Sequence, residues 1–150
     1  MNRKGIILIT VAVLLAITYI QFFSDWFSSP RIQIIPQVRP IRALQTIPSV
    51  LPVSFILRGS YKLTRVKVVE LGVFQTNKYV APVWHLISKT NSPPIQGLTY
   101  GLPIPGMVLA NSNAPPQELL PHITYRLFVE AGRAKGDVDF QTREADQTQN

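Results

Sequence analysis

Cysteine is absent from this 150-residue sequence, and histidine occurs only twice. Without cysteine the chain forms no disulfide and carries no lipid-modified cysteine of the bacterial lipoprotein kind, so an exported domain must be held together by its core. The two histidines show no metal-ligand spacing. A G-x-S-x-G nucleophile motif and a glycine-rich phosphate loop are also missing. We therefore expect no catalytic residue, no metal and no cofactor, and predict that the protein is not an enzyme.

Formal charge is missing from one long stretch, residues 5–23, which reads GIILITVAVLLAITYIQFF. At about 1.5 Å per residue, a helix of this length is roughly 28 Å long, close to the thickness of the hydrocarbon core of a bilayer. Its apolar residues lie on every side, which favours a membrane-spanning helix over a soluble amphipathic one. The sequence thus predicts a basic start at 1–4, a transmembrane signal anchor at 5–23 and a stalk at 24–30.

The charges that flank this stretch predict its orientation. Arg3 and Lys4 precede it, whereas Asp25 is the first charge after it. Basic flanks stay in the cytoplasm, so we expect a single-pass protein of the bacterial inner membrane with a cytoplasmic N-terminus and a periplasmic C-terminal domain. A cleaved secretory signal is the alternative, but the residues around Phe23 offer only a weak cleavage site.

Beyond the apolar stretch, basic residues outnumber acidic ones by thirteen to eight, a net charge of +5. The first half of this part is basic, and its end is acidic. The basic half is typical of a solvated sheet face; contact with anionic lipid headgroups or with an acidic envelope polymer is the alternative. Nucleic acid is excluded as a partner by the expected compartment and by the lack of aromatic residues among the basic ones.

All thirteen prolines follow the apolar stretch, and many of them bracket short runs rich in Val and Ile. Such runs, with turn residues every eight to twelve positions and no helix between them, predict about seven strands in an all-β domain. We expect a single antiparallel β-sandwich over residues 31–140, followed by a polar, disordered tail at 141–150. Within residues 63–71 the apolar alternation slips by one position, which predicts a β-bulge.

The run ELLPHITYRLFVEAG at residues 118–132 has the spacing L-x-P-x-I-x-Y-x-L-x-V. It resembles the pattern that leads into the penultimate strand of fibronectin type III and Ig-like domains. The resemblance implies that Leu119, Pro121 and Tyr125 form a structural corner, in which the Tyr125 hydroxyl bonds to backbone a few residues upstream. Trp84 would then fill the core, although the tryptophan of fibronectin modules more usually sits on the preceding strand.

Strict alternation in this run places Tyr125, Leu127 and Val129 on one face, as core residues. Phe128 falls on the opposite, polar face. We expect either that a loop of the proline-rich insert at 89–117 covers it or that it belongs to a contact surface. The insert supplies Leu98, Tyr100, Ile104 and Met107, and these side chains either pack down on the sheet or dock a partner.

Together these patterns favour a membrane-anchored, extracytoplasmic β-sandwich that acts as a non-catalytic binding or assembly module, with another envelope protein as its partner. One alternative is a pseudopilin-like minor component of a secretion or pilus machine. The start RKGIILIT resembles a prepilin start, with Thr10 where those proteins carry Glu. The other alternative is a glycan-binding or accessory domain of a secreted enzyme system. The oligomeric state is not indicated by any pattern.

Overall fold

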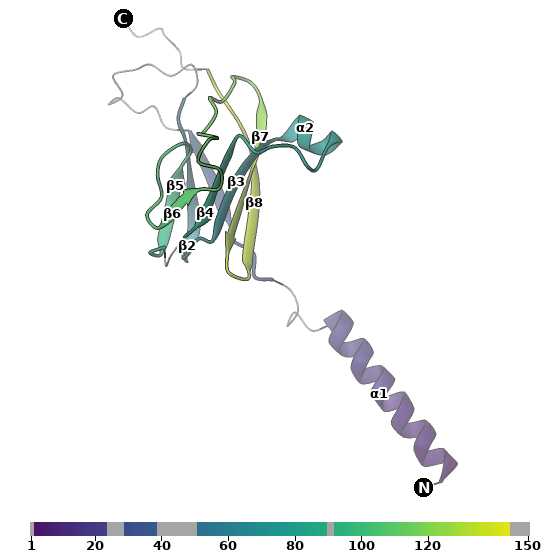
Figure 1. Cartoon of the computed structure of the whole chain (residues 1–150). Helices are drawn as coiled ribbons and strands as arrows, with labels where there is room; N and C mark the ends of the chain where they lie inside the picture. The colour runs from purple at the N-terminus through teal and green to yellow at the C-terminus, as the bar shows by residue number, and fades with distance from the viewer. Residues whose placement is uncertain (1, 24–28, 39–50, 90–91, 145–150) are drawn as a thin grey trace, which may run out of the picture.

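The computed structural model of the chain describes residues 2–23, 29–38, 51–89 and 92–144. Helix α1 spans Arg3–Phe23, two residues more than the predicted stretch. Its segment Arg3–Gln21 is long and apolar enough to cross a membrane, and none of it is buried against the rest of the protein. Figure 1 shows α1 as a separate rod outside the folded domain. Most of the predicted stalk, residues 24–28, lies outside the described residues.

Two antiparallel sheets make up the domain. The smaller has the strand order β1-β2-β5, and the larger has the order β6-β4-β3-β7-β8. The strands are β1 (Ile34–Val38), β2 (Val53–Tyr61), β3 (Arg65–Glu70), β4 (Trp84–Ser88), β5 (Ile95–Thr99), β6 (Met107–Leu109), β7 (Thr124–Ala131) and β8 (Ala134–Gln141). The prediction of a β-rich domain with two antiparallel sheets is thus confirmed.

The core lies between the two sheets, because each contributes its alternate residues to one buried cluster. From the smaller sheet come Phe55 and Leu98, and from the larger come Leu127 and Phe140. The rings of Phe55 and Phe140 meet edge to face with centroids 4.9 Å apart, across the space between β2 and β8. This packing holds the sheets together without a disulfide.

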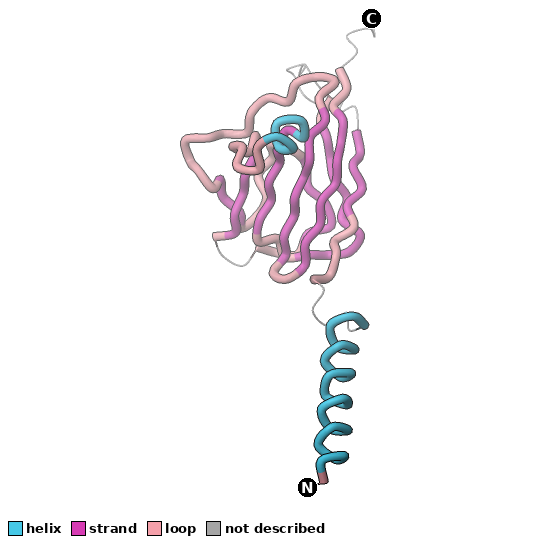
Figure 2. Tube along the Cα trace, turned by 90° about the vertical axis from the view of Figure 1, so that its right-hand side faces the viewer, coloured by secondary structure: helices cyan, strands magenta, loops and turns pink. Residues whose placement is uncertain are grey.

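The chain enters the domain beside the β7–β8 hairpin. Pro30 accepts a backbone hydrogen bond from Lys135, and the N–H of Ile32 donates to the carbonyl of Lys135 at 2.9 Å. A Cβ at position 136 would collide with the carbonyl oxygen of Ile32, so only glycine permits this close approach. The first residues of the domain are therefore fixed at one end of the larger sheet (Figure 2).

A short helix, α2 (Leu71–Thr76), follows β3 directly, so the prediction of no helix between the strands was wrong. The predicted bulge was wrong too, because β3 pairs with β7 in unbroken register from Arg65 to Glu70. The apolar slip has another cause. Val69 pairs with Arg126 near the end of β3 that leads into α2, and its side chain points to the outer face of the sheet. It is fully buried there, although it does not belong to the main core.

The predicted disordered tail also starts too early. Strand β8 runs to Gln141, and Thr142 is 1% exposed. Residues 145–150, the rest of the predicted tail, lie outside the described residues.

Candidate functional site

The four residues predicted from the insert pack into the domain instead of facing outward. Leu98, Ile104 and Met107 belong to the buried core cluster, and Tyr100 packs against it. They pack down on the sheets, which was one of the two expectations; that they dock a partner stays a prediction. Leu98 lies on β5 and Met107 on β6, and Tyr100 and Ile104 lie in the segment between these two edge strands.

Tyr100 fixes the start of the loop that follows β5. Its hydroxyl donates to the carbonyl oxygen of Gln117 at 2.6 Å and lies 3.3 Å from that of Val83. Its ring packs at 5.2 Å from that of Trp84, which is 2% exposed in the core. Burial, with a smaller effect of Tyr125, raises the pKa of the Tyr100 phenol, so this group remains a neutral donor.

Tyr125 lies where the corner requires a buried tyrosine. The N–H of Leu120 donates to the Tyr125 hydroxyl at 3.1 Å, five residues upstream in the chain. Leu119 is buried beside this corner and Pro121 is half-buried. On β7, the next two core positions are Leu127 and Val129, and both are fully buried.

Thr142 completes the corner, and the sequence pattern missed it. Its hydroxyl lies within hydrogen-bonding distance of the carbonyl oxygens of Leu120 and Ile123 and accepts from the N–H of Ile123. The N–H of His122 donates to the carbonyl oxygen of Thr142, and the N–H of Thr142 donates to that of Ile123. These bonds hold the same turn, in which His122 adopts a positive φ of 60°. A threonine in a polar segment gives no sequence signal of this role.

Phe128 is half-buried on the outer face of the larger sheet. Its ring meets that of Phe74 edge to face, with centroids 5.5 Å apart. The expected cover, a loop of the insert, is therefore corrected to helix α2. This contact also argues against Phe128 as a contact surface, because Phe74 already occupies part of its ring.

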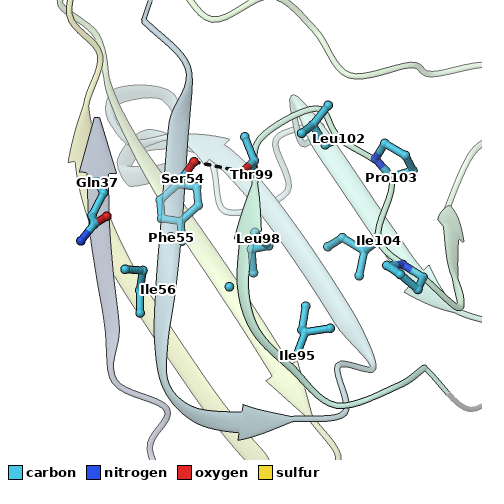
Figure 3. A pocket seen from close by; sticks show the side chains of 12 residues that line it. Gln37, Ser54, Phe55, Ile56, Ile95, Leu98, Thr99, Leu102, Pro103 and Ile104 are labelled. Carbon is cyan, nitrogen blue, oxygen red and sulfur yellow. Dashed lines mark hydrogen bonds between the residues drawn. The ribbon is translucent and has the colours of Figure 1, made fainter. Parts of the chain in front are cut away.

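A groove of about 370 Å³ lies on the outer side of the smaller sheet, across β5. In Figure 3, β5 runs between β2 and the segment that follows β5. Three groups of residues line the groove: Gln37, Ser54, Phe55 and Ile56 from β1 and β2; Ile95, Gly97, Leu98 and Thr99 from β5; and Leu102, Pro103, Ile104 and Pro105 from the following segment. Its sides therefore come from parts of the chain that sequence analysis treated separately.

The groove is apolar with a polar rim. Ile56 and Leu102 are 38% and 56% exposed, whereas Ser54 and Thr99 are joined by a hydroxyl–hydroxyl hydrogen bond of 3.0 Å. Gly97 faces outward in β5 and leaves the strand backbone uncovered. None of the twelve lining residues ionises near neutral pH. The groove can hold an uncharged apolar group, but its own side chains supply no acid, base or nucleophile of shifted pKa.

Two prolines shape the wall of the groove. Strand β5 is an edge strand of the smaller sheet. Pro103 and Pro105 have no N–H to donate, so the segment 102–105 is unsuited to extend the sheet as a further strand. One backbone hydrogen bond joins β5 to this segment, from the N–H of Leu102 to the carbonyl oxygen of Thr99 at 3.2 Å, and among the described residues none joins 95–98 to it. Among the described residues, no further strand pairs with the outer edge of β5, which lies beside an apolar wall.

The two histidines lie apart from this groove. His85 is on β4, where burial and then the charges of Arg65 and Lys67 lower its pKa, against a weaker opposite effect of Glu130. His122 is exposed at the corner, 3.9 Å from Glu144. Within the described ranges, no group of three or more His, Cys, Asp or Glu side chains is placed to hold a metal.

Comparisons with protein-family models, with curated proteins and with solved structures find no match for this chain.

Proposed function

We propose that the protein is a single-pass membrane protein whose extracytoplasmic β-sandwich is a non-catalytic binding module for another envelope protein. The observation that carries this proposal is the uncharged groove beside the open edge of β5. Such an edge offers backbone hydrogen bonds to an extended segment, and an apolar wall offers pockets for its side chains.

Helix α1 supports the membrane part of the proposal. Its 19-residue segment has a mean hydropathy of 2.0. The hydroxyls of Thr10 and Thr18 donate to the carbonyl oxygens of Ile6 and Leu14, one turn earlier, so they leave no polar group unpaired in a bilayer. Arg3 and Lys4 at the start of the helix support the orientation with the domain outside the cytoplasm, in the periplasm.

The strand order supports a fibronectin III-like or Ig-like type of sandwich. If β1, β2, β3, β4, β5, β7 and β8 are taken as A, B, C, C′, E, F and G, the sheets become A-B-E and C′-C-F-G. This is the Ig arrangement without strand D and with C′ added beside C. Strand β6 is an extra edge strand next to C′, and Trp84 lies on C′.

The proposed ligand is an extended, uncharged and mainly apolar segment of a partner protein. It would lie along β5, bond to the backbone at the open edge and place a side chain over Gly97 against Ile56 and Leu102. A charged segment is disfavoured, because no lining residue could compensate its charge.

Site-specific photocrosslinking of the full-length protein in its native membrane tests this function. A photoreactive residue replaces Ile56 in the groove, and a matched variant carries it at Val73, which is similarly exposed at 41% on α2. We expect a discrete adduct with one envelope protein from position 56 and none from position 73. Equal labelling from both positions, or no adduct at either, would contradict the proposal.

A further inference from the structure

The basic residues of the domain gather at the end where the chain enters it. This proximal end comprises the residues around Pro30, the β2–β3 turn, the β7–β8 turn and the start of the β4–β5 connection, which are joined by backbone hydrogen bonds such as Thr64 to Glu130 and Ser88 to Thr64. Seven basic residues lie there, all exposed: Arg31, Arg58, Lys62, Arg65, Lys89, Arg133 and Lys135. The acidic residues beside them are Glu130 and Asp137, which line one hollow with Arg31 and Lys135, so among the described residues seven basic side chains face two acidic ones and this end is positive.

The remainder of the described domain has no such excess. It contains four basic residues, Lys67, Lys78, Arg126 and Arg143, against four acidic ones, Glu70, Glu118, Asp139 and Glu144. The sequence alone showed a basic first half, but the fold assembles the proximal end from both halves of the chain. Lys89, Arg133 and Lys135 join it through the β4–β5 connection and the β7–β8 hairpin.

Most of this positive charge is not neutralised inside the protein. Glu130 is shared between Arg65 and Lys135, with nitrogen–oxygen distances of 3.7 Å to each. The Arg58 guanidinium donates to the neutral side chain of Gln33. Among the described residues, no acidic partner contacts Arg31 or the three residues Lys62, Lys89 and Arg133.

Chain length keeps the proximal end close to the membrane. Seven residue steps separate Phe23, the last residue of α1, from Pro30, which is already bonded to the β7–β8 hairpin. A fully extended chain spans at most about 3.6 Å per residue, so this end lies within about 25 Å of the helix end. If α1 spans the bilayer, the seven basic residues therefore stay within reach of the headgroups of the leaflet that the domain faces.

We propose that the proximal end binds the anionic phosphate headgroups of this leaflet and thereby holds the domain against the membrane in a defined orientation. Juxtamembrane basic residues are attracted to anionic lipid by about 1 kcal/mol each, which is roughly a fivefold change in binding per residue. This inference goes beyond the proposed function, because it concerns a different surface and requires only that α1 spans the membrane.

Resonance energy transfer in lipid nanodiscs tests the inference. Because the chain has no cysteine, a single Ser60→Cys substitution places a donor dye at the proximal end, and Gln75→Cys places one on α2 at the opposite end. Acceptor dyes sit on the headgroups. We expect higher transfer from position 60 with about 30% phosphatidylglycerol than with phosphatidylcholine alone, a much smaller change from position 75, and loss of the difference in 0.5 M NaCl.

Charge reversal supplies the control. The triple variant Lys62→Glu, Lys89→Glu and Arg133→Glu should lower the preference for anionic lipid by a hundredfold or more, at fivefold or more per residue. Lys78→Glu with Arg143→Glu, at the other end, should leave it unchanged. Equal transfer in both lipids, or an effect that survives the triple reversal, would overturn the inference. The inference would also be overturned if the proximal end bound soluble polyglutamate but not the anionic bilayer. That result would identify an acidic polymer as its partner.

Discussion

The outer faces of the two sheets differ in how far their apolar side chains are covered. On the larger sheet, Phe128 meets Phe74 of α2, and the charged residues around it form pairs such as Arg126 with Asp139. On the smaller sheet, Ile35 and Ile56 remain 46% and 38% exposed, and no helix within the described ranges covers them. Within the described residues, a helix covers part of the outer face of the larger sheet and none covers that of the smaller sheet, which is why we propose the partner site on the smaller sheet.

The largest difference in stability between the two faces is expected when one outer-face residue of each sheet is truncated. Phe128→Ala removes one ring of the partly buried aromatic contact with α2, and we expect it to lower the free energy of unfolding by about 2 kcal/mol. Ile56→Ala, on the open face, should cost less than about 1 kcal/mol. Chemical denaturation of the full-length protein in detergent measures both. Equal losses would mean that the two faces are packed alike.

A double-mutant cycle between Phe74 and Phe128 measures how strongly α2 is coupled to the outer face of the larger sheet. Edge-to-face aromatic pairs contribute about 0.5–1.5 kcal/mol beyond their buried area. We therefore expect a coupling free energy of about 1 kcal/mol between Phe74→Ala and Phe128→Ala. The pair Phe74→Ala and Ile56→Ala serves as the uncoupled control. Strict additivity of the first pair would show that α2 does not close this face.

The smallest effect is expected from the ion pair on the closed face. Arg126 donates to both carboxylate oxygens of Asp139, at 2.8 Å from its terminal nitrogen, and this hydrogen bonding lowers the pKa of Asp139. A lowered carboxyl pKa stabilises the fold above the unfolded value of about 3.8, and this contribution is lost as pH falls through the folded value.

Because both side chains of this pair are partly exposed, Asp139→Asn should cost less than about 1 kcal/mol at pH 7. The cost of the same substitution should shrink as pH falls from 7 to 2 through the lowered pKa of Asp139. Denaturation curves at the two pH values give this difference, and an equal cost at both would assign the loss to packing instead of charge.

Sequence alone predicted the elements that depend on local patterns. The uncharged length of residues 5–23 indicated α1, and strict alternation around Leu127 indicated β7 and its core face. Sequence patterns did not predict features that depend on contacts between segments far apart in the chain. The apolar slip at Val69 predicted a bulge. Val69 is instead buried on the outer face near α2, and a local pattern cannot predict burial that depends on tertiary packing.

The site was harder to predict than the fold. The sequence singled out four residues of the insert, but their burial depends on where the edge strands β5 and β6, and the segment between them, lie in the fold. The groove joins Ile56 with Leu102, residues 46 positions apart whose proximity follows from the pairing of β2 with β5. Thr142 was missed for a similar reason, since a buried hydroxyl in a polar segment has no pattern of its own.

One measurement tests the open face most directly. A photocrosslinker replaces Leu102 in the groove wall, and the adduct is quantified in the presence of Ile56→Lys or Ile35→Lys. Both isoleucines face outward from the smaller sheet, but only Ile56 lines the groove. The proposal predicts that Ile56→Lys lowers the adduct at least tenfold, because it buries an uncompensated charge, while Ile35→Lys leaves it intact. An adduct that responds equally to both substitutions would contradict the assignment of the groove as the binding site.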